Sequence, residues 1–413
     1  MSEWIKAEEY CVSVFDGTHD TPKVTETGYK LVTSKNILSN TLDLNSAYYI
    51  SEEDFVNINK RSKVKQYDIL FSMIGTVGSL YFETSDTIDY AIKNIGVFSC
   101  GNKEKAEWLY YYLQSSYAQQ YIKRYLNGAV QKFLPLKGLR EFPVPQFNKE
   151  LHNRIKILLN IDQKIQINNQ INQELEAMAK TLYDYWFVQF DFPDQNGKPY
   201  KSSGGKMAYN QDLKREIPEG WRVETLKNFE SKIITGKTPS RANSDNFGGE
   251  IPFITIGDIR GNTFVYSTSE SLTDLGASVQ QNKYLPEGSL CVSCIATVGE
   301  IGFTTEWSHT NQQINSIVFE DETNRYYLYF ALKNYFENAN ASAKTGNTFA
   351  NMNKEDFSGI RIILPRNEIK NNFHKITEPY FAQIKCLQGQ NQELTQLRDW
   401  LLPMLMNGQV KVE

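Results

Sequence analysis

The sequence lacks the features on which several classes of protein depend. No long hydrophobic run is present: the longest weakly polar stretch, Ile69 to Leu80, is broken by Ser, Gly and Thr and is far too short to span a membrane. The start, MSEWIKAEEY, has neither a basic end nor an apolar stretch, so no signal peptide is expected. Cysteines are few and odd in number, five in all, which indicates reduced thiols and a cytoplasmic location.

A surplus of basic residues is also missing. The chain has 44 Lys and Arg against 48 Asp and Glu, a net charge of −4, and no segment is strongly basic. A protein that grips DNA unaided normally presents a basic face, because it must neutralise phosphates. If this chain binds DNA, its basic residues must therefore cluster in space, or a partner must contribute.

Catalytic motifs are equally scarce. Gly236-Lys-Thr238 resembles the end of a phosphate-binding loop, but the earlier glycine that the motif requires is Ser231. Cys291 and Cys294 have the spacing of half a zinc site, yet no second pair exists and residues three apart on a strand point to opposite faces. No Asn-Pro-Pro-aromatic tetrapeptide or Gly-rich cofactor loop occurs. The chain is therefore expected to hold no metal and no cofactor, and not to be an enzyme.

The chain does carry an internal repeat. Asp68-Ile-Leu-Phe-Ser-Met-Ile-Gly-Thr-Val-Gly78 aligns without a gap with Ser289-Leu-Cys-Val-Ser-Cys-Ile-Ala-Thr-Val-Gly299. Further matches in the same order extend the repeat in both directions: Trp4 with Trp221, Thr21-Pro22 with Thr238-Pro239, Asn94 with Asn315, Phe98 with Phe319, Gln173-Glu-Leu175 with Gln392-Glu-Leu394, and Leu182 with Leu401. This order indicates a duplication.

Each half divides into a head and a long helix. In the heads, 1–148 and 210–365, β-branched and aromatic runs alternate with Gly-containing turns. We expect strands at Ile251–Ile256 and Ser289–Ile295, and helices at Ala106–Tyr125 and Tyr326–Ala339. Long helices are expected at 149–190 and, with a C-terminal tail, at 366–413; the segment 191–209, rich in Pro, Gly and Ser, has the composition of a linker. The predicted fold class is α+β: two repeated β-containing domains separated by two long helices in an antiparallel, pseudo-twofold coiled coil.

Apolar residues in the long helices recur at alternating steps of three and four, the pattern of a coiled-coil seam. A helix this long needs a partner for its seam, and the best available partner is the other helix. Asn172 and Asn391 fall at matching seam positions, where a buried amide can fix the register, although plain solvated positions are the alternative. Pro379 predicts a kink or the true start of the second helix. The predicted seam residues are Ile161, Ile165, Asn172, Leu175, Leu182, Ile384, Leu387, Asn391, Leu394 and Leu401.

Two heads on paired helices are suited to hold two recognition surfaces at a fixed separation. From Lys149 to Phe187 the first helix would be on the order of 58 Å long at about 1.5 Å per residue. That length corresponds to roughly 17 base pairs of DNA, an outer bound because the helix ends pack on the heads. Two heads about one turn of the duplex apart would face the same side of it.

This order of head, helix, linker and second head resembles the specificity subunits of type I restriction-modification systems. The resemblance covers essentially the whole chain, although the first head has no Ile-Pro-Glu-Gly before Trp4, which leaves its exact start open. It rests on the linker Phe190-Asp-Phe-Pro193 with Gly197-Lys-Pro-Tyr-Lys-Ser-Ser-Gly-Gly205, the opening Ile217-Pro-Glu-Gly-Trp221, the turn Ala296-Thr-Val-Gly299 and the ending Leu401-Leu-Pro-Met-Leu-Met-Asn-Gly408.

The resemblance implies a non-catalytic subunit of a DNA adenine methyltransferase and endonuclease complex. Each head would be a target-recognition domain for one half of a bipartite, asymmetric target in double-stranded DNA. The expected partners are two modification subunits, which carry S-adenosylmethionine, and restriction subunits in the full complex; no membrane is expected. Such partners would account for the acidic balance, since they would help to enclose the DNA.

Polar and basic residues in loops near the repeated turns are the predicted DNA contacts. Asn and Gln match adenine edges, while Arg and Lys match guanine or phosphate; an ordinary solvated loop position is the alternative for each. In the first head these residues are Lys35, Asn36, Thr76, Lys93, Asn94, Gln131 and Lys132. In the second head they are Lys237, Arg241, Arg260, Thr297, Asn311, Gln312, Gln313 and Asn347.

Two rival functions remain open from the residues. One is a coiled-coil scaffold whose heads bind proteins and not DNA, which the lack of a basic surplus favours. The other is a methyltransferase or nuclease in its own right, which the missing catalytic motifs oppose.

Overall fold

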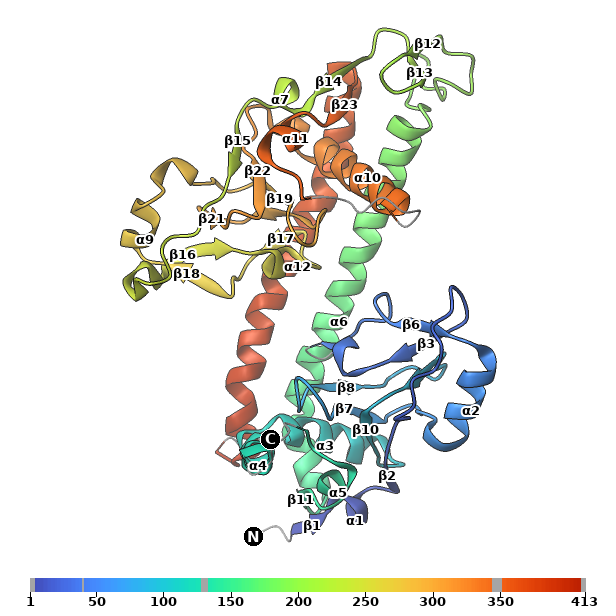
Figure 1. Ribbon diagram of the computed structural model, residues 1–413, viewed down its shortest axis with the longest axis vertical. Helices are drawn as coiled ribbons and strands as arrows, with labels where there is room; N and C mark the ends of the chain where they lie inside the picture. The colour runs from blue at the N-terminus through green and yellow to red at the C-terminus, as the bar shows by residue number, and fades with distance from the viewer. Residues whose placement is uncertain (1–3, 39–40, 128–132, 344–350, 410–413) are drawn as a thin grey trace. The chain divides into compact units, whose positions relative to one another are not determined.

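The computed structural model describes residues 4–38, 41–127, 133–343 and 351–409. The chain divides into two compact units, Met1–Gln163 with Gln396–Glu413, and Lys164–Thr395. Each unit consists of one head and parts of both long helices, as the labelled elements in Figure 1 show. The first unit is therefore assembled from two separate stretches of the chain.

The first head contains two small sheets. The central strands of the larger sheet are fully buried on both faces, which explains their uninterrupted apolar sequence. This antiparallel sheet has the order β2 (Ser13–Asp16), β10 (Ile95–Ser99), β7 (Ile69–Ser72), β8 (Leu80–Phe82); the other has the order β6 (Tyr48–Ile50), β3 (Tyr29–Val32), β9 (Tyr90–Ile92), with β3 and β9 parallel. The remaining elements are β1 (Trp4–Lys6) paired with β11 (Pro143–Pro145), β4 (Ile37–Leu38) paired with β5 (Thr41–Leu42), and the helices α1 (Ala7–Tyr10), α2 (Glu52–Ser62), α3 (Lys103–Gln114), α4 (Ser116–Asn127) and α5 (Leu136–Arg140).

The second head repeats this topology. Its larger sheet has the order β15 (Ile233–Thr235), β22 (Ile314–Ile317), β19 (Leu290–Ser293), β20 (Ile301–Thr304), β17 (Phe264–Val265); the smaller has the order β18 (Glu270–Leu272), β16 (Phe247–Ile254), β21 (His309–Thr310), with β16 and β21 parallel. The remaining elements are β12 (Met207–Asn210) paired with β13 (Arg215–Pro218), β14 (Arg222–Thr225) paired with β23 (Arg361–Leu364), and the helices α7 (Leu226–Phe229), α8 (Ile256–Ile259), α9 (Asp274–Ser278), α10 (Arg325–Ala343) and α11 (Lys354–Ser358). The duplication seen in the sequence is thus a duplication of fold.

The helix predicted over Ala106–Tyr125 is divided in two. Ser115 has an extended backbone, with φ −62° and ψ 154°, which ends α3. Its side-chain oxygen accepts a hydrogen bond from the backbone N–H of Ala118 (3.3 Å) and so caps the start of α4. The apolar periodicity of the sequence continues across the break because each of the two helices buries an apolar face.

The long helices are α6 (Lys149–Tyr183), which ends in a π-helical turn over Asp184–Val188, and α12 (Asn367–Met406). Of the two expectations for Pro379, a kink or the true start of the second helix, the start does not hold, because α12 begins at Asn367 and continues through that proline. No helix within the described ranges combines the length and apolar character that crossing a membrane requires.

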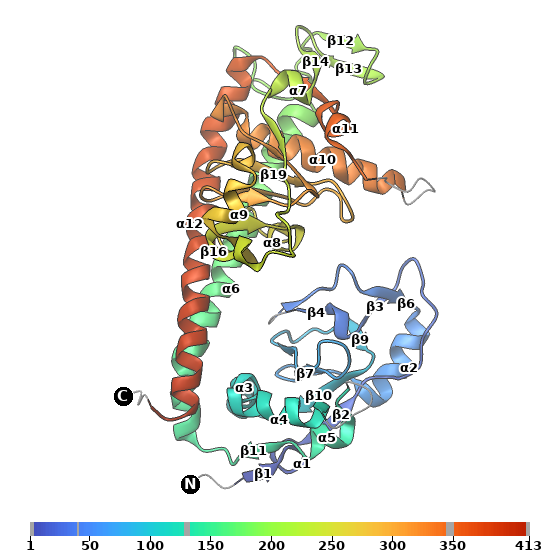
Figure 2. The same cartoon turned by 60° about the vertical axis from the view of Figure 1, so that its left-hand side comes forward.

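The two long helices pack together and run antiparallel, which confirms the expected architecture. In the first unit, Arg398 of α12 binds Asp162 of α6 (2.9 Å). In the second unit, later positions of α6 meet earlier positions of α12, as in the contact between the rings of Tyr183 and Phe373. The same unit has α10 packed on α6 (Figures 1 and 2), where the carboxylate of Glu176 accepts hydrogen bonds from Lys333, from Tyr329 (2.7 Å) and from Thr263 (3.3 Å).

An amide cluster lies between the helices in the second unit. Asn168 Nδ2 donates to Asn391 Oδ1 (2.8 Å), and Asn391 Nδ2 donates to Asn169 Oδ1 (2.8 Å). Asn172 is buried, and within the described part of the chain its Oδ1 has no hydrogen-bond partner. The predicted seam residues are all buried or half-buried: Ile161, Ile165, Asn172, Leu175, Leu182, Ile384, Leu387, Asn391, Leu394 and Leu401.

The segment with linker composition packs on the second head. The Phe192 ring stacks on Tyr200 (4.6 Å between centroids) and on Trp221 (5.0 Å). The Asp191 carboxylate accepts hydrogen bonds from the N–H and the O–H of Ser202 (2.7 and 2.6 Å). Here Pro, Gly and Ser form the turns of a folded lobe.

Candidate nucleic-acid interface

The repeated Thr-Val-Gly segment forms the same turn in both heads. In each, the glycine N–H donates to the carbonyl of the serine that opens the turn, at 3.0 Å for Gly78 and 2.9 Å for Gly299. These glycines have φ angles of 98° and 95°, a conformation that side chains rarely adopt. The turn leaves Thr76 and Thr297 exposed.

In the second head this turn carries a charged pair. Arg260 Nε lies 3.1 Å from Glu300 Oε1, and Arg260 Nη2 donates to Thr297 Oγ1 (3.2 Å). The position of Glu300 is held by Ser79 in the first head. The two turns therefore share a backbone and differ in the hydrogen-bonding groups that they present.

A second polar group in the second head surrounds the end of β21. Thr238 donates its hydroxyl hydrogen to Gln312 Oε1 (2.5 Å), and Asn311 Nδ2 donates to Gln313 Oε1 (3.1 Å). Lys237, next to Thr238, is exposed. The structure thus places Lys237 beside Asn311, Gln312 and Gln313, and all four residues were predicted as DNA contacts from the sequence.

The first head has a matching contact. Lys93 Nζ bonds to Thr21 Oγ1, so in both heads the threonine of the Thr-Pro repeat binds a residue just beyond a strand of the smaller sheet. Asn94 has φ 54° and contacts His19 (2.8 Å between Oδ1 and Nδ1). The sequence analysis missed His19, Thr21 and Thr238 as site residues, although the Thr-Pro match of the repeat was the signal that pointed to two of them.

Arg241 lies on another loop of the second head. It binds Glu270 with two parallel hydrogen bonds (2.7 and 2.8 Å) and lies over the ring of Phe247. The hydrogen bond to Glu270 raises the pKa of Arg241, and that from Arg241 lowers the pKa of Glu270. Like Arg260, Arg241 is pre-oriented by a carboxylate of its own head.

Asn36 serves the fold of the first head. Its Oδ1 accepts from the N–H and O–H of Thr33 (2.8 and 2.9 Å), and its Nδ2 donates to Asp43 O and Ser46 Oγ (3.3 and 3.1 Å). Because the side chain is buried and bonded at both ends, we omit it from the DNA contacts proposed below, whereas its exposed neighbour Lys35 stays among them. Three other predicted contacts, Gln131, Lys132 and Asn347, lie outside the described residues.

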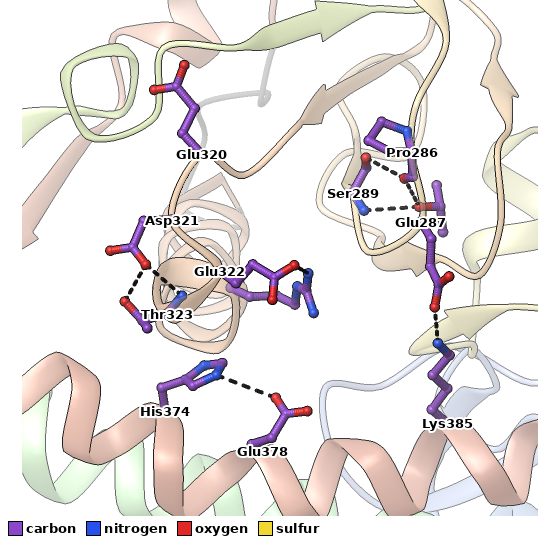
Figure 3. Close-up of polar contacts among 12 residues, drawn as sticks. Pro286, Glu287, Ser289, Glu320, Asp321, Glu322, Thr323, His374, Glu378 and Lys385 are labelled. Atoms are coloured by element: carbon purple, nitrogen blue, oxygen red, sulfur yellow. Dashed lines mark hydrogen bonds and ion pairs between the residues drawn. The ribbon is translucent and has the colours of Figure 1, made fainter.

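A cavity of about 660 Å³ lies in the second unit, between the head and α12. Figure 3 shows polar contacts at and beside the cavity: Lys385 pairs with Glu287, Glu322 pairs with Arg325 (3.3 Å), and His374 Nε2 lies 3.5 Å from Glu378 Oε2. None of the DNA contacts predicted from the sequence is among the described residues that line it. We therefore place the candidate interface at the loops and not here.

Within the described ranges, no group of three or more His, Cys, Asp or Glu residues is arranged so that it could hold a metal ion. Cys291 and Cys294 are both buried, and Ser316 donates its hydroxyl hydrogen to the Cys291 sulfur (3.5 Å). Burial raises the pKa of Cys291 to about 12 and of Cys294 to about 11, so both are neutral thiols at ordinary pH.

Comparison with known proteins matches each half separately. The family profile described as the type I restriction modification DNA specificity domain matches residues 20–177 and again residues 218–396. Each match takes in one head and the helix that follows it.

Curated relatives match along most of the chain. The type I restriction enzyme HindI specificity subunit of Haemophilus influenzae is 31% identical over 408 residues, covering 85% of this chain and 88% of that protein. The MjaIX specificity subunit of Methanocaldococcus jannaschii is 26% identical over 317 residues, covering 75% and 70%. The type I restriction-modification S subunit from M. genitalium, a crystal structure, is 13% identical and has a TM-score of 0.45 over 98% of this chain and 96% of that one. Because the family profile matches both of its halves, the chain belongs to the family of type I restriction-modification DNA specificity subunits.

Proposed function

We propose that each head of this specificity subunit recognises one half of a bipartite, asymmetric DNA target, while the paired helices hold the heads apart and dock the modification and restriction subunits. As a specificity subunit, the chain is the non-catalytic part that recognises the DNA target, and S-adenosylmethionine belongs to the modification subunit. The observation that carries the proposal is that two heads of the same topology present different polar groups on equivalent loops.

Differences in equivalent loops favour an asymmetric target. Lys93, just beyond β9, and Gln312, just beyond β21, both bind the threonine of the Thr-Pro repeat, yet one is a cation and the other an amide. At equivalent positions beside the repeated turn, Ser79 carries a neutral hydroxyl and Glu300 a carboxylate. Since cations suit guanine or phosphate and amides suit adenine, such heads would recognise different bases.

The DNA contacts that we propose are the predicted residues whose side chains reach the surface loops. In the first head they are Lys35, Thr76, Lys93 and Asn94. In the second head they are Lys237, Arg241, Arg260, Thr297, Asn311, Gln312 and Gln313.

Exposed apolar residues support partner docking on the helices. On α6, Ile167, Ile171 and Met178 are 42%, 38% and 50% exposed. On α12, Leu397 and Trp400 are 43% and 60% exposed. Large apolar side chains that recur on the outer face of a helix suit a helical partner with a complementary face.

The decisive experiment is co-expression of the chain with the modification subunit encoded beside it, followed by mapping of methylated adenines across the host genome. A split motif that requires both proteins supports the proposal. Replacing the second head, residues 210–365, with that of another specificity subunit should change one half of the motif only. A stable complex with an active modification subunit that methylates no motif would favour the protein-binding scaffold instead.

A further inference from the structure

The duplication offers an internal comparison at one tryptophan. Trp4 and Trp221 are equivalent in the repeat, and each stands at the strand pair that closes the base of its head. Trp4 itself pairs with Pro145 of β11. The two indole rings nevertheless differ in environment, since Trp221 is 6% exposed and Trp4 is 48% exposed.

Three phenylalanines cover Trp221. The Phe192 ring stacks on the indole with centroids 5.0 Å apart and planes 19° apart. Phe190 meets it edge-on at 5.8 Å, and Phe187 lies 6.0 Å away. All three come from the stretch that follows α6, so the second head takes its aromatic cover from the segment after a long helix.

Trp4 has less cover among the residues that the structure describes. Its ring stacks on Tyr117, with centroids 4.8 Å apart and planes 25° apart, and its centroid lies 6.2 Å from that of Tyr112, but Tyr117 is itself 52% exposed. In the alignment that places Leu182 on Leu401, Met406 stands at the position of Phe187, Gln409 at that of Phe190 and Lys411 at that of Phe192. The sequence therefore has no aromatic residue at the three positions that correspond to the cover of Trp221, and two of the three residues are polar.

We propose that Trp4 and Tyr117 form a docking surface for an aromatic-bearing segment of the modification subunit, seated as Phe192 is seated on Trp221. The chain's own second head shows which chemistry this site accepts: an aromatic ring laid flat on the indole, from a short stretch outside any helix or strand. Trp and Tyr are also among the side chains that most often anchor protein interfaces. Here the two rings are adjacent and half-exposed. This inference rests on the proposed function for the identity of the partner and adds a contact on the first head to the docking on the helices.

The first test is hydroxyl-radical footprinting of the full-length chain, alone and in complex with the modification subunit. Trp4 and Tyr117 should be oxidised readily in the free chain and at least about 5-fold more slowly in the complex. Trp307, which is 62% exposed on the second head, is the matched control and should react equally in both. Because this measurement uses the natural sequence, it does not depend on how well any variant folds.

The second test compares the binding of variants. Trp4→Ala and Tyr117→Ala should each weaken the affinity for the modification subunit by about 10-fold or more, the range for an anchoring aromatic residue. Trp307→Ala should bind as the natural chain does, and thermal melts establish that each variant is folded. A complex in which Trp4 stays as reactive as in the free chain overturns this inference alone. A natural chain that forms no complex with the modification subunit overturns both the inference and the partner docking proposed above.

Discussion

The pairing of Arg260 with Glu300 leads to a prediction with opposite signs for its two members. If Arg260 contacts a guanine edge, Arg260→Ala should remove about 1–3 kcal/mol of binding free energy, a loss of about 5- to 150-fold at the second half-site. Glu300 would then compete with DNA for the same guanidinium. Because the side chains of this pair are 58% and 28% exposed, the ion pair contributes at most about 1 kcal/mol. Glu300→Gln should therefore tighten binding, by no more than about 5-fold.

Fluorescence anisotropy at one fixed salt concentration measures both effects on the complex with the modification subunit. Three duplexes suffice: the full target, one with the first half-site scrambled and one with the second half-site scrambled. Arg260→Ala should weaken binding to the first two duplexes and leave the third unchanged. Equal losses on all three, or a Glu300→Gln variant that binds more weakly, would refute the reasoning. If the losses are equal, repeating the titrations at several salt concentrations identifies the contact: a shallower salt dependence in the variant assigns Arg260 to a phosphate and not to a base.

Three further predictions concern stability, measured by urea unfolding. His309 is fully buried, and burial lowers its pKa to about 4, whereas its pKa in the unfolded chain is about 6.5. Between pH 6.5 and pH 4 the free energy of unfolding of the natural chain should therefore fall by up to about 3 kcal/mol relative to that of His309→Phe. Parallel pH profiles of the two chains would contradict this. Asn391→Leu should lower the free energy of unfolding by about 1–2 kcal/mol, whereas adding Asn168→Leu should recover most of that loss, because the buried partner is then gone too and the exposed Asn169 can bond to water; additive losses would argue against the pairing. Burial alone would raise the pKa of Glu176, but Lys333 and the hydrogen bonds hold it below its ordinary value. Glu176→Gln should therefore lower the free energy of unfolding by about 1–3 kcal/mol at pH 7, and this difference should shrink as the pH falls below about 4.5; a difference that stays constant as the pH falls would contradict this origin.

The architecture could be predicted from the sequence because it depends on patterns that repeat. Two copies of one ordered set of motifs require two similar heads, and seam residues at steps of three and four require long helices with a partner. Whether Pro379 begins, kinks or merely lies within α12 could not be predicted, because proline is a strong signal for a helix end and its tolerance depends on packing along the helix. The break at Ser115 could not be predicted for a related reason. It depends on a local capping hydrogen bond, and the apolar periodicity does not change there.

The candidate site was predictable in part. Residue type and proximity to the repeated turns selected Arg260, Thr297 and Gln312, which lie on three loops of the second head and form two polar contacts, Arg260 with Thr297 and Gln312 with Thr238. The same reasoning selected Asn36, because an amide in a polar stretch has the same appearance whether it caps a turn or faces solvent. Only the three-dimensional arrangement separates those cases, since the bonds of Asn36 go to residues that a one-dimensional pattern does not associate with it.

The construction of the first unit from two stretches of chain affects the order in which this protein matures on the ribosome. Leu405, near the end of α12, is fully buried in the same apolar cluster as Ile155 and Leu158 of α6. The first head is translated early, but the residues that complete its apolar base emerge only after the whole second head has been made. Until then the apolar cluster around Ile155 lacks the cover that Leu405 gives it, so premature termination in the second half leaves apolar surface that chaperones and proteases can recognise. The first unit can therefore be completed only after the second head has been translated.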